Sequence, residues 1–281
     1  MNRQTKDKFV RWFLGVCAGV GCSLLVLVLA AVLWRGHSAL SIEFLFSKPG
    51  EFGEGGIFYQ VLGTLLLMAG AGILSFPIAL GAALFQTEIL RPGKVSELFQ
   101  LLMYSLNAVP TVLFGLIGFM VFGVWLNTGV SWVTGVLILA VMILPTIQTA
   151  MRQSIEAIPE HYQEAARALG LSTWQRIMAV VFPQSAYGLV TGVLLGLARA
   201  TGETAAIMFT ATVFSGILIP ESFNDPVLTL QTHILTLAQE AVDPNTLANA
   251  WGAGFALICI VFFLIGLSLI LRSRYVVEAD S

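Results

Sequence analysis

The sequence predicts an all-α, polytopic membrane protein with six transmembrane helices. The 281 residues are 57% hydrophobic and only 11% charged, whereas about a quarter of the residues of a soluble domain are charged. Six apolar runs, each near the roughly 20 residues that cross a bilayer, lie between the charged segments. Basic residues also cluster in alternate connections between the runs, as they do in polytopic membrane proteins.

The six expected spans are, in order, 13–34, 57–84, 101–125, 130–150, 186–219 and 250–271. The first run exceeds 20 residues and has no small-residue cleavage pattern, so we expect a retained helix and not a signal peptide. One membrane domain over 1–281 follows, with an N-terminal helix and outer loop over 1–56, a core bundle over 57–271 and a tail over 272–281.

The positions of Lys and Arg predict the orientation of the chain, because basic loops resist translocation. The opposite side of the predicted topology carries only Arg35 and Lys48. We therefore expect both termini to be cytoplasmic. The basic residues on the predicted cytoplasmic side are Arg3, Lys6, Lys8, Arg11, Arg91, Lys94, Arg152, Arg167, Arg176, Arg272 and Arg274.

Other features of the runs bear on helix geometry. Pro77 and Pro110 each remove a backbone hydrogen bond and predict a bend or interruption, or a plain packing kink. The glycine-rich, acidic stretch 50–56 suits an outer turn. The apolar series within 225–246 predicts a short surface helix, either at the membrane interface or, as we favour, packed on the bundle. The three cysteines and three histidines are scattered, so no metal site is expected.

Residues 151–183 leave the membrane on the basic side and predict two short helices joined by a glycine. Pro159 suits the first turn of the first helix, and Gly170 suits the left-handed conformation that ends it. Ser172 and Gln175 have the spacing of a capping box that starts the second helix, which is expected to end near the proline that closes this segment. A compact, alanine-rich elbow favours docking into another protein, with an ordinary structured loop as the alternative.

This segment resembles the E-A-A, Gly, Ile-x-Leu-Pro loop of binding-protein-dependent ABC importer permeases. The resemblance implies the MetI-like fold of type I importers and a coupling helix that sits on a cytoplasmic ATPase dimer. ATP is then bound by partner subunits, and the permease itself is non-catalytic and needs no cofactor, which fits the absence of a Gly-x-x-x-x-Gly-Lys-Ser/Thr loop from the sequence. The residues that carry the resemblance are Glu164, Ala165, Ala166 and Gly170, then Val180, Val181, Phe182 and Pro183, with Val180 and Phe182 in place of the isoleucine and leucine.

The fifth run is the only one with internal charges, Arg199 and Glu203. Each charge costs about 2.5–3.5 kcal/mol to insert, so both should face the bundle interior. As a straight helix the run would be about 50 Å long, against a hydrocarbon core of about 30 Å, and must project, tilt or break. The spacing of four predicts either a structural ion pair, or an arginine that binds an oxyanion with the glutamate orienting it or exchanging for the anion. Thr201 and Thr204 add hydroxyl donors or bond to their own backbone.

The same element resembles the R-x-x-G-E-T-A pattern of phosphate-specific transport permeases of the PstA type. Ala206 departs from that pattern, which often has proline there, and predicts a smaller bend after Glu203. The resemblance implies phosphate as cargo, a PstC-like second permease, a PstB-like ATPase dimer and a PstS-like soluble binding protein. The residues that carry it are Gly55, Gly56, Ile57, Gly63, Thr64 and Leu65, Val109, Pro110 and Gly115, and Arg199, Gly202, Glu203, Thr204 and Ala205.

Other functions remain open from the sequence. A permease of the same architecture for another oxyanion or polar solute shares every feature above. A membrane signalling or scaffold subunit that reports transporter occupancy is a second alternative. A membrane enzyme is disfavoured, since the sequence groups no nucleophile, metal set or acid–base pair beyond Arg199 and Glu203.

Overall fold

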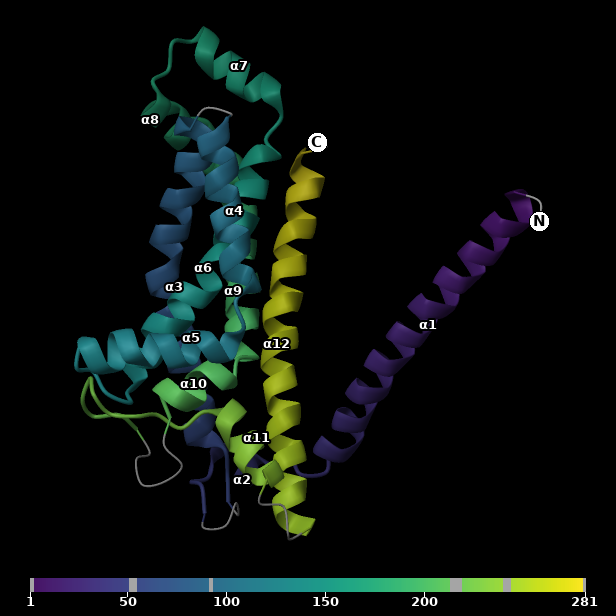
Figure 1. Cartoon of the computed structure of the whole chain (residues 1–281), viewed down its shortest axis with the longest axis vertical. Coiled ribbons are helices and arrows are strands. Elements are labelled where there is room, and N and C mark those ends of the chain that lie inside the picture. The colour runs from purple at the N-terminus through teal and green to yellow at the C-terminus, as the bar shows by residue number, and fades with distance from the viewer. Residues whose placement is uncertain (1–2, 51–54, 91–92, 213–218, 240–243, 280–281) are drawn as a thin grey trace.

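The computed structural model describes residues 3–50, 55–90, 93–212, 219–239 and 244–279, with the backbone alone for 3–6 and 272–279. All regular elements in these residues are helical, and α3, α6, α9 and α12 run side by side as a bundle (Figure 1). They are α1 (Arg3–Gly36), α2 (Ile42–Phe46), α3 (Phe58–Leu84), η2 (Phe85–Ile89), α4 (Lys94–Ala108), α5 (Thr111–Gly118), η3 (Phe119–Trp125), α6 (Trp132–Glu156), α7 (Glu160–Ala168), α8 (Thr173–Arg176), η4 (Ile177–Val181), α9 (Phe182–Thr201), α10 (Ala205–Thr210), α11 (Leu230–Gln239) and α12 (Pro244–Ala279).

The helical content confirms the predicted fold class. Within the described residues, five helices are long and apolar enough to cross a membrane, and the bent pair α4 and α5–η3 makes a sixth crossing if it is counted as one broken span. Five of the expected spans therefore correspond to α1, α3, α6, α9 and α12. The third expected span corresponds to the bent pair.

Two of the expected spans are interrupted, at Pro110 and within the long fifth run, which are two of the geometries anticipated for them. The third bends by 94° between α4 and α5, with Val109 in extended conformation and Pro110 at the start of α5. The fifth ends at Thr201, and a separate short helix, α10, follows; residues 213–218 of that expected span lie outside the described part of the chain. Pro77, in contrast, lies inside α3 without ending it.

The core of the bundle forms around α6. Its N-cap Ser131 accepts a hydrogen bond from the Thr134 N–H at 3.2 Å, which fixes where the helix begins. Ile143, Ile147 and Met151 on α6 are completely buried. Helices α3 and α9 pack directly on α6, and α12 packs on α9. The close packing of these buried side chains stabilises the contacts of α3 and α9 with α6.

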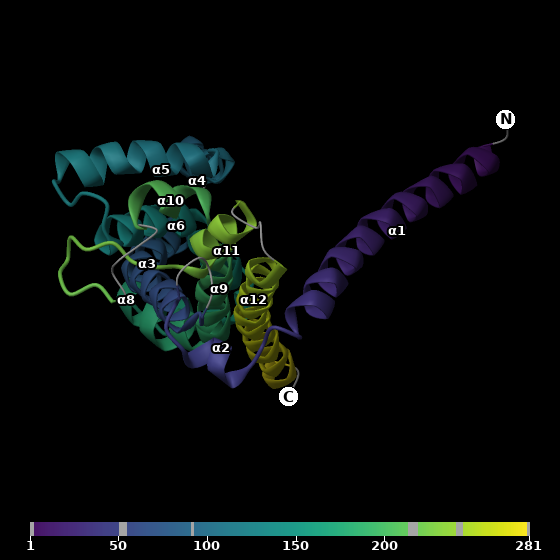
Figure 2. The same cartoon turned by 90° about the horizontal axis from the view of Figure 1, so that it is seen from below.

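Helix α1 leaves the bundle. Both views show it leaning away from the other helices and meeting α12 only near its own C-terminal end (Figures 1 and 2). There the Arg35 guanidinium lies 5.1 Å from the centre of the Trp251 ring. The apolar side chains along the rest of α1, such as Leu25 and Leu27, are exposed. This surface must meet lipid or another chain.

The segment 225–246 contains the expected helix, α11, and it packs on α3 and α12 with Leu230 and Leu237 buried. The prediction of a helix packed on the bundle is therefore confirmed. In Figure 1 the N-terminal end of α1 and the C-terminal end of α12 both point toward the side of the molecule that carries α7 and α8. The side chains of Arg3, Lys6, Arg91, Arg272 and Arg274, the tail residues 280–281 and residues 51–54 of the expected turn lie outside the described residues.

Candidate functional site

Residues 160–176, which we name the elbow, form α7, a turn and α8 at one end of the bundle (Figure 1). Pro159 is the N-cap of α7, and Gly170 has a φ of 71°, the left-handed conformation predicted for it. The Ser172 hydroxyl accepts from the Gln175 N–H while the Gln175 side chain accepts from the Ser172 N–H, so the predicted capping box is confirmed.

The end of the second helix is predicted wrongly. From Thr173 the chain stays helical through η4 and α9 to Thr201, and Pro183 lies exposed in the first turn of α9. The wider π-helical turn of η4 directly precedes that proline. A proline is tolerated where the regular hydrogen-bond ladder is already interrupted, which explains why the helix does not stop.

The other residues of the expected coupling motif lie on α7 in two different environments. Ala166 is buried, whereas Glu164 and Ala165 are exposed. The elbow also exposes Leu169 and Trp174, at 79% and 63% of their surfaces. A projecting turn with exposed acidic, small and large apolar side chains has the chemistry of a protein contact surface.

Arg199 lies in the last turn of α9, where it contacts two polar side chains that the sequence did not single out. Its Nη1 donates to Asn107 Oδ1 at 2.6 Å and to Thr146 Oγ1 at 2.7 Å, and the Thr146 hydroxyl also donates to Asn107 Oδ1 at 3.3 Å. All three residues are half-buried. Asn107 stands just before the bend that follows α4, and Thr146 follows Pro145 within α6. The sequence feature that could have identified Asn107 and Thr146 is that each is a polar residue within an apolar run.

Glu203 does not share a helical face with Arg199, because α9 ends at Thr201 and Gly202 is its C-cap. Its side chain turns instead to α10, where Oε1 accepts a hydrogen bond from the Ala206 N–H at 3.3 Å. Among the described residues the ion pairs are Arg152–Glu156 and Arg176–Glu88. The predicted pairing of Arg199 with Glu203 is therefore not the arrangement in this structure.

The two candidate threonines behave differently. The Thr201 hydroxyl donates to the Leu197 carbonyl oxygen at 2.8 Å, the backbone bond anticipated for it, and also lies 3.0 Å from Met68 Sδ. Thr204 is the half-buried N-cap residue of α10. The free carbonyl of Thr201 accepts from Gln231 Nε2 of α11 at 2.6 Å. The end of α9 is thus satisfied by side chains from other helices.

The two broken spans meet beside Arg199. Helix α10 packs on α5 and α6, and Arg199 bonds the end of α4. Irregular backbone at membrane depth persists only where protein covers it or where it lines a polar passage. In carriers, interrupted helices of this kind surround the substrate site. This region is therefore the candidate site for a polar solute.

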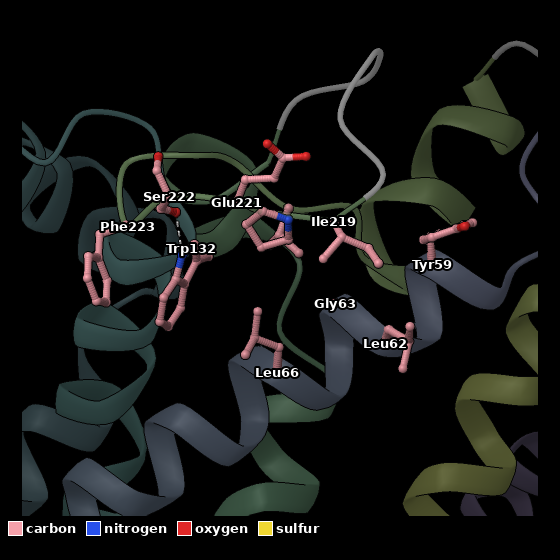
Figure 3. Close-up of a pocket in the computed structure, with 11 residues that line it drawn as sticks. Tyr59, Leu62, Gly63, Leu66, Trp132, Ile219, Glu221, Ser222 and Phe223 are labelled. Atoms are coloured by element: carbon pink, nitrogen blue, oxygen red, sulfur yellow. Dashed lines mark hydrogen bonds between the residues drawn. The ribbon is translucent and has the colours of Figure 1, made fainter.

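A separate cavity of about 420 Å³ lies between α3 and residues 219–227 (Figure 3). Tyr59, Leu66 and Trp132 contribute to its wall, and Trp132 Nε1 donates to the Ser222 carbonyl oxygen at 3.0 Å. The ring of Phe223 stacks on Trp132 with centroids 5.9 Å apart. The cavity lining does not include the residues around the guanidinium, so this cavity is distinct from the polar site.

Known proteins resemble this chain in both sequence and fold. The family model described as binding-protein-dependent transport system inner membrane component matches residues 75–278. The chain is 29% identical to the phosphate transport system permease protein PstA of Haemophilus influenzae, over 91% of this chain and 89% of that one. It is 32% identical to the probable ABC transporter permease protein YqgH of Bacillus subtilis, over 97% and 93%.

The chain also resembles the phosphate transport system permease protein PstC of Haemophilus influenzae, with 31% identity over 78% of this chain and 79% of that one. Among solved structures, the MetNI methionine ABC transporter in an inward-facing conformation matches with a TM-score of 0.61 and 15% identity. That match covers 77% of this chain and 97% of the other. It shows a shared fold and confirms the MetI-like architecture expected from the elbow.

Proposed function

Because the chain belongs to the family of binding-protein-dependent transport system inner membrane components, we propose that it is a permease subunit of an ATP-driven importer of inorganic phosphate. It forms the translocation pathway with a second, PstC-like permease. A PstB-like ATPase dimer docks on the elbow and supplies the energy, and a PstS-like binding protein delivers phosphate at the opposite end. Similarity to PstA proteins supports phosphate as the cargo.

The observation that carries this proposal is the setting of the Arg199 guanidinium. Within the described residues, both of its hydrogen bonds leave from Nη1. The Nε–Nη2 edge is available for two parallel N–H···O bonds, the geometry in which arginine binds phosphate. Asn107 and Thr146 hold the side chain in place before an anion arrives, which lowers the entropic cost of binding.

The charge balance around Arg199 also favours an anion. In the described part of the chain no carboxylate pairs with this guanidinium, and the nearest acidic residue in sequence, Glu203, bonds the Ala206 N–H. A guanidinium whose partners are all neutral has no counter-charge beside it, and an anion is attracted more strongly to it where the dielectric constant is low. Phosphate or another oxyanion supplies the missing negative charge.

Membrane placement follows from the basic residues near the elbow. Arg167 lies on α7, Arg176 on α8 and Arg152 in the last turns of α6, and Lys94 begins α4. Short basic connections remain on the cytoplasmic side. We place the elbow, both termini and the tail in the cytoplasm and α11 on the outer side of a bacterial inner membrane.

The half-exposed polar site supports the presence of a second permease. Arg199, Asn107 and Thr146 are only partly covered by this chain, and an arginine that faces lipid is costly. A companion chain over this face closes the passage and can also cover the apolar surface of α1.

The experiment is uptake of radiolabelled phosphate by vesicles that contain the chain with its companion permease, ATPase and binding protein. Arg199→Lys keeps the charge but loses the planar fork, and loss of one charge-assisted bond of about 1.5–3 kcal/mol should reduce uptake about 10- to 100-fold. Arg152→Lys, near the end of α6 and paired with Glu156, is the matched control. Excess sulfate tests the cargo. Full uptake by Arg199→Ala, or uphill uptake without the ATPase, would contradict the proposal.

A further inference from the structure

An ion pair between residues far apart in sequence joins the elbow to the bundle. Arg176 Nη2 of α8 lies 2.5 Å from Glu88 Oε2 of η2, and the two side chains are only 14% and 2% exposed. Helix α7 itself contacts η4. Removing one partner of a buried pair leaves an uncompensated charge in a poorly hydrated place. The elbow and the end of α3 are therefore held together as one unit.

The segment that carries Glu88 is also fixed to the core. Within η2, Gln86 Oε1 accepts a hydrogen bond from Gln148 Nε2 of α6 at 2.8 Å, and both side chains are buried. Side chains of the π-helical turn η2 thus contact two different neighbours, α6 through Gln86 and α8 through Glu88. Such turns are frequent at functional positions.

The other end of α3 reaches the polar site. The Thr64 hydroxyl donates to Gln231 Oε1 at 3.2 Å and accepts from the Leu230 N–H at 3.0 Å. Gln231 Nε2 in turn donates to the Thr201 carbonyl oxygen at 2.6 Å, two residues from Arg199. Thr64 and Glu88 lie 24 positions apart on a continuous helix, which spans about 36 Å at 1.5 Å per residue.

We propose that α3 with η2 transmits movement of the elbow to the polar site, and that Glu88 and Arg176 are the positioning residues that connect the elbow to this helix. A continuous helix with buried polar bonds at both ends carries displacement along its axis. This route runs beside the helix that continues from α8 through η4 into α9. The inference rests on the proposed function, since it requires an ATPase that moves the elbow.

The first test is the ratio of phosphate imported to ATP hydrolysed by the reconstituted complex. Glu88→Gln and Arg176→Gln should keep the bound ATPase and lower this ratio about tenfold, within the range of usual coupling free energies. The charge-swapped double variant Glu88→Arg with Arg176→Glu should recover much of the loss. The pair Arg152–Glu156 on α6, with an N–O distance of 2.6 Å and a Glu156 side chain that is 50% exposed, is the matched control, and Glu156→Gln should leave the ratio unchanged.

Three outcomes overturn the proposal. An unchanged ratio in both single variants shows that the pair transmits nothing. A swapped variant no better than the single ones shows that the charge pairing is irrelevant. Loss of the ATPase from the single variants shows that the pair serves docking alone. If the wild-type complex imports another solute, the proposed cargo fails, while the ratio of that solute to ATP still tests Glu88.

A second measurement follows the movement itself. Spin labels at Leu169→Cys on the elbow and Ile89→Cys on η2, both exposed positions, report the distance between these elements after Cys17, Cys22 and Cys259 are replaced by serine. The distance should stay constant between the nucleotide-free and ATP-bound complex, and Glu88→Gln should make it vary. A distance that changes with nucleotide in the otherwise native chain overturns the proposal.

Discussion

Gly63 marks the tightest crossing in α3, and a single methyl group there should have a measurable cost. A Cβ at this position would lie 1.9 Å from the Leu228 carbonyl oxygen and 2.6 Å from Val227 Cγ2. The carbonyl belongs to the backbone and cannot rotate away, so residues 227–228 must move off the helix. Overpacking of this kind costs about 1–3 kcal/mol. The neighbouring Thr64 bonds to α11 would lengthen with it.

Gly81 supplies the comparison within the same helix. A Cβ there meets nothing within 4 Å, so Gly81→Ala should be neutral or stabilise by up to about 1 kcal/mol through helix propensity. Gly63→Ala should melt about 2–12 °C lower than Gly81→Ala, at roughly 2–4 °C per kcal/mol for a chain of this size. Thermal unfolding of the two variants in one detergent decides the matter. Equal melting temperatures would refute the packing argument.

Three other changes have defined outcomes. Asn107→Ala removes one acceptor of Arg199 at 2.6 Å while Thr146 remains, so the KM for phosphate uptake should rise about 5- to 10-fold; an unchanged KM would show that Asn107 does not position the guanidinium. Gly170→Ala forces an alanine to a φ of 71° at about 1–2 kcal/mol, so less ATPase should co-purify than with Gly170→Asn, and equal recovery would count against the turn. Burial lowers the pKa of His233 to about 4, below its unfolded value near 6.5, so the folded state binds fewer protons. Its stability contribution should be complete above pH 6.5 and fall by about 3 kcal/mol toward pH 4, a slope that His233→Gln should reduce in pH-dependent melting; an equal slope would contradict this assignment.

The elbow could be predicted from sequence because its geometry is local. A left-handed glycine and a capping box need only residues within one or two turns, and both are present as expected at Gly170, Ser172 and Gln175. The helices α3 and α6 could also be predicted from the sequence, because a long apolar run can cross a bilayer only as a helix or as a strand of a closed barrel.

The sequence left open which proline interrupts its span and where the fifth run breaks, because distant contacts decide both. Pro77 stays within α3, while Pro110 follows a 94° bend. Contacts with distant residues flank the bend at Pro110. Asn107 before the bend is bonded by Arg199, and a Cβ on Gly115 after it would lie 2.9 Å from the Cα of Ala206. These pairs lie more than 90 positions apart, beyond the reach of any local pattern.

Ala206 clarifies the chemistry of Glu203. The related element often has proline at this position, and its absence predicted a smaller bend; yet the chain breaks before Glu203, at Gly202. The alanine matters instead through its N–H, which donates to Glu203 Oε1 at 3.3 Å, a bond that proline cannot make. The carboxylate also lies at the positive end of α10, where its charge is stabilised. Glu203 is satisfied by this local bond and does not pair with Arg199. Among the described residues, the hydrogen-bond partners of Arg199 are therefore all neutral. The departure from proline thus leaves the guanidinium without a carboxylate partner among the described residues, as the proposed binding of an anion requires.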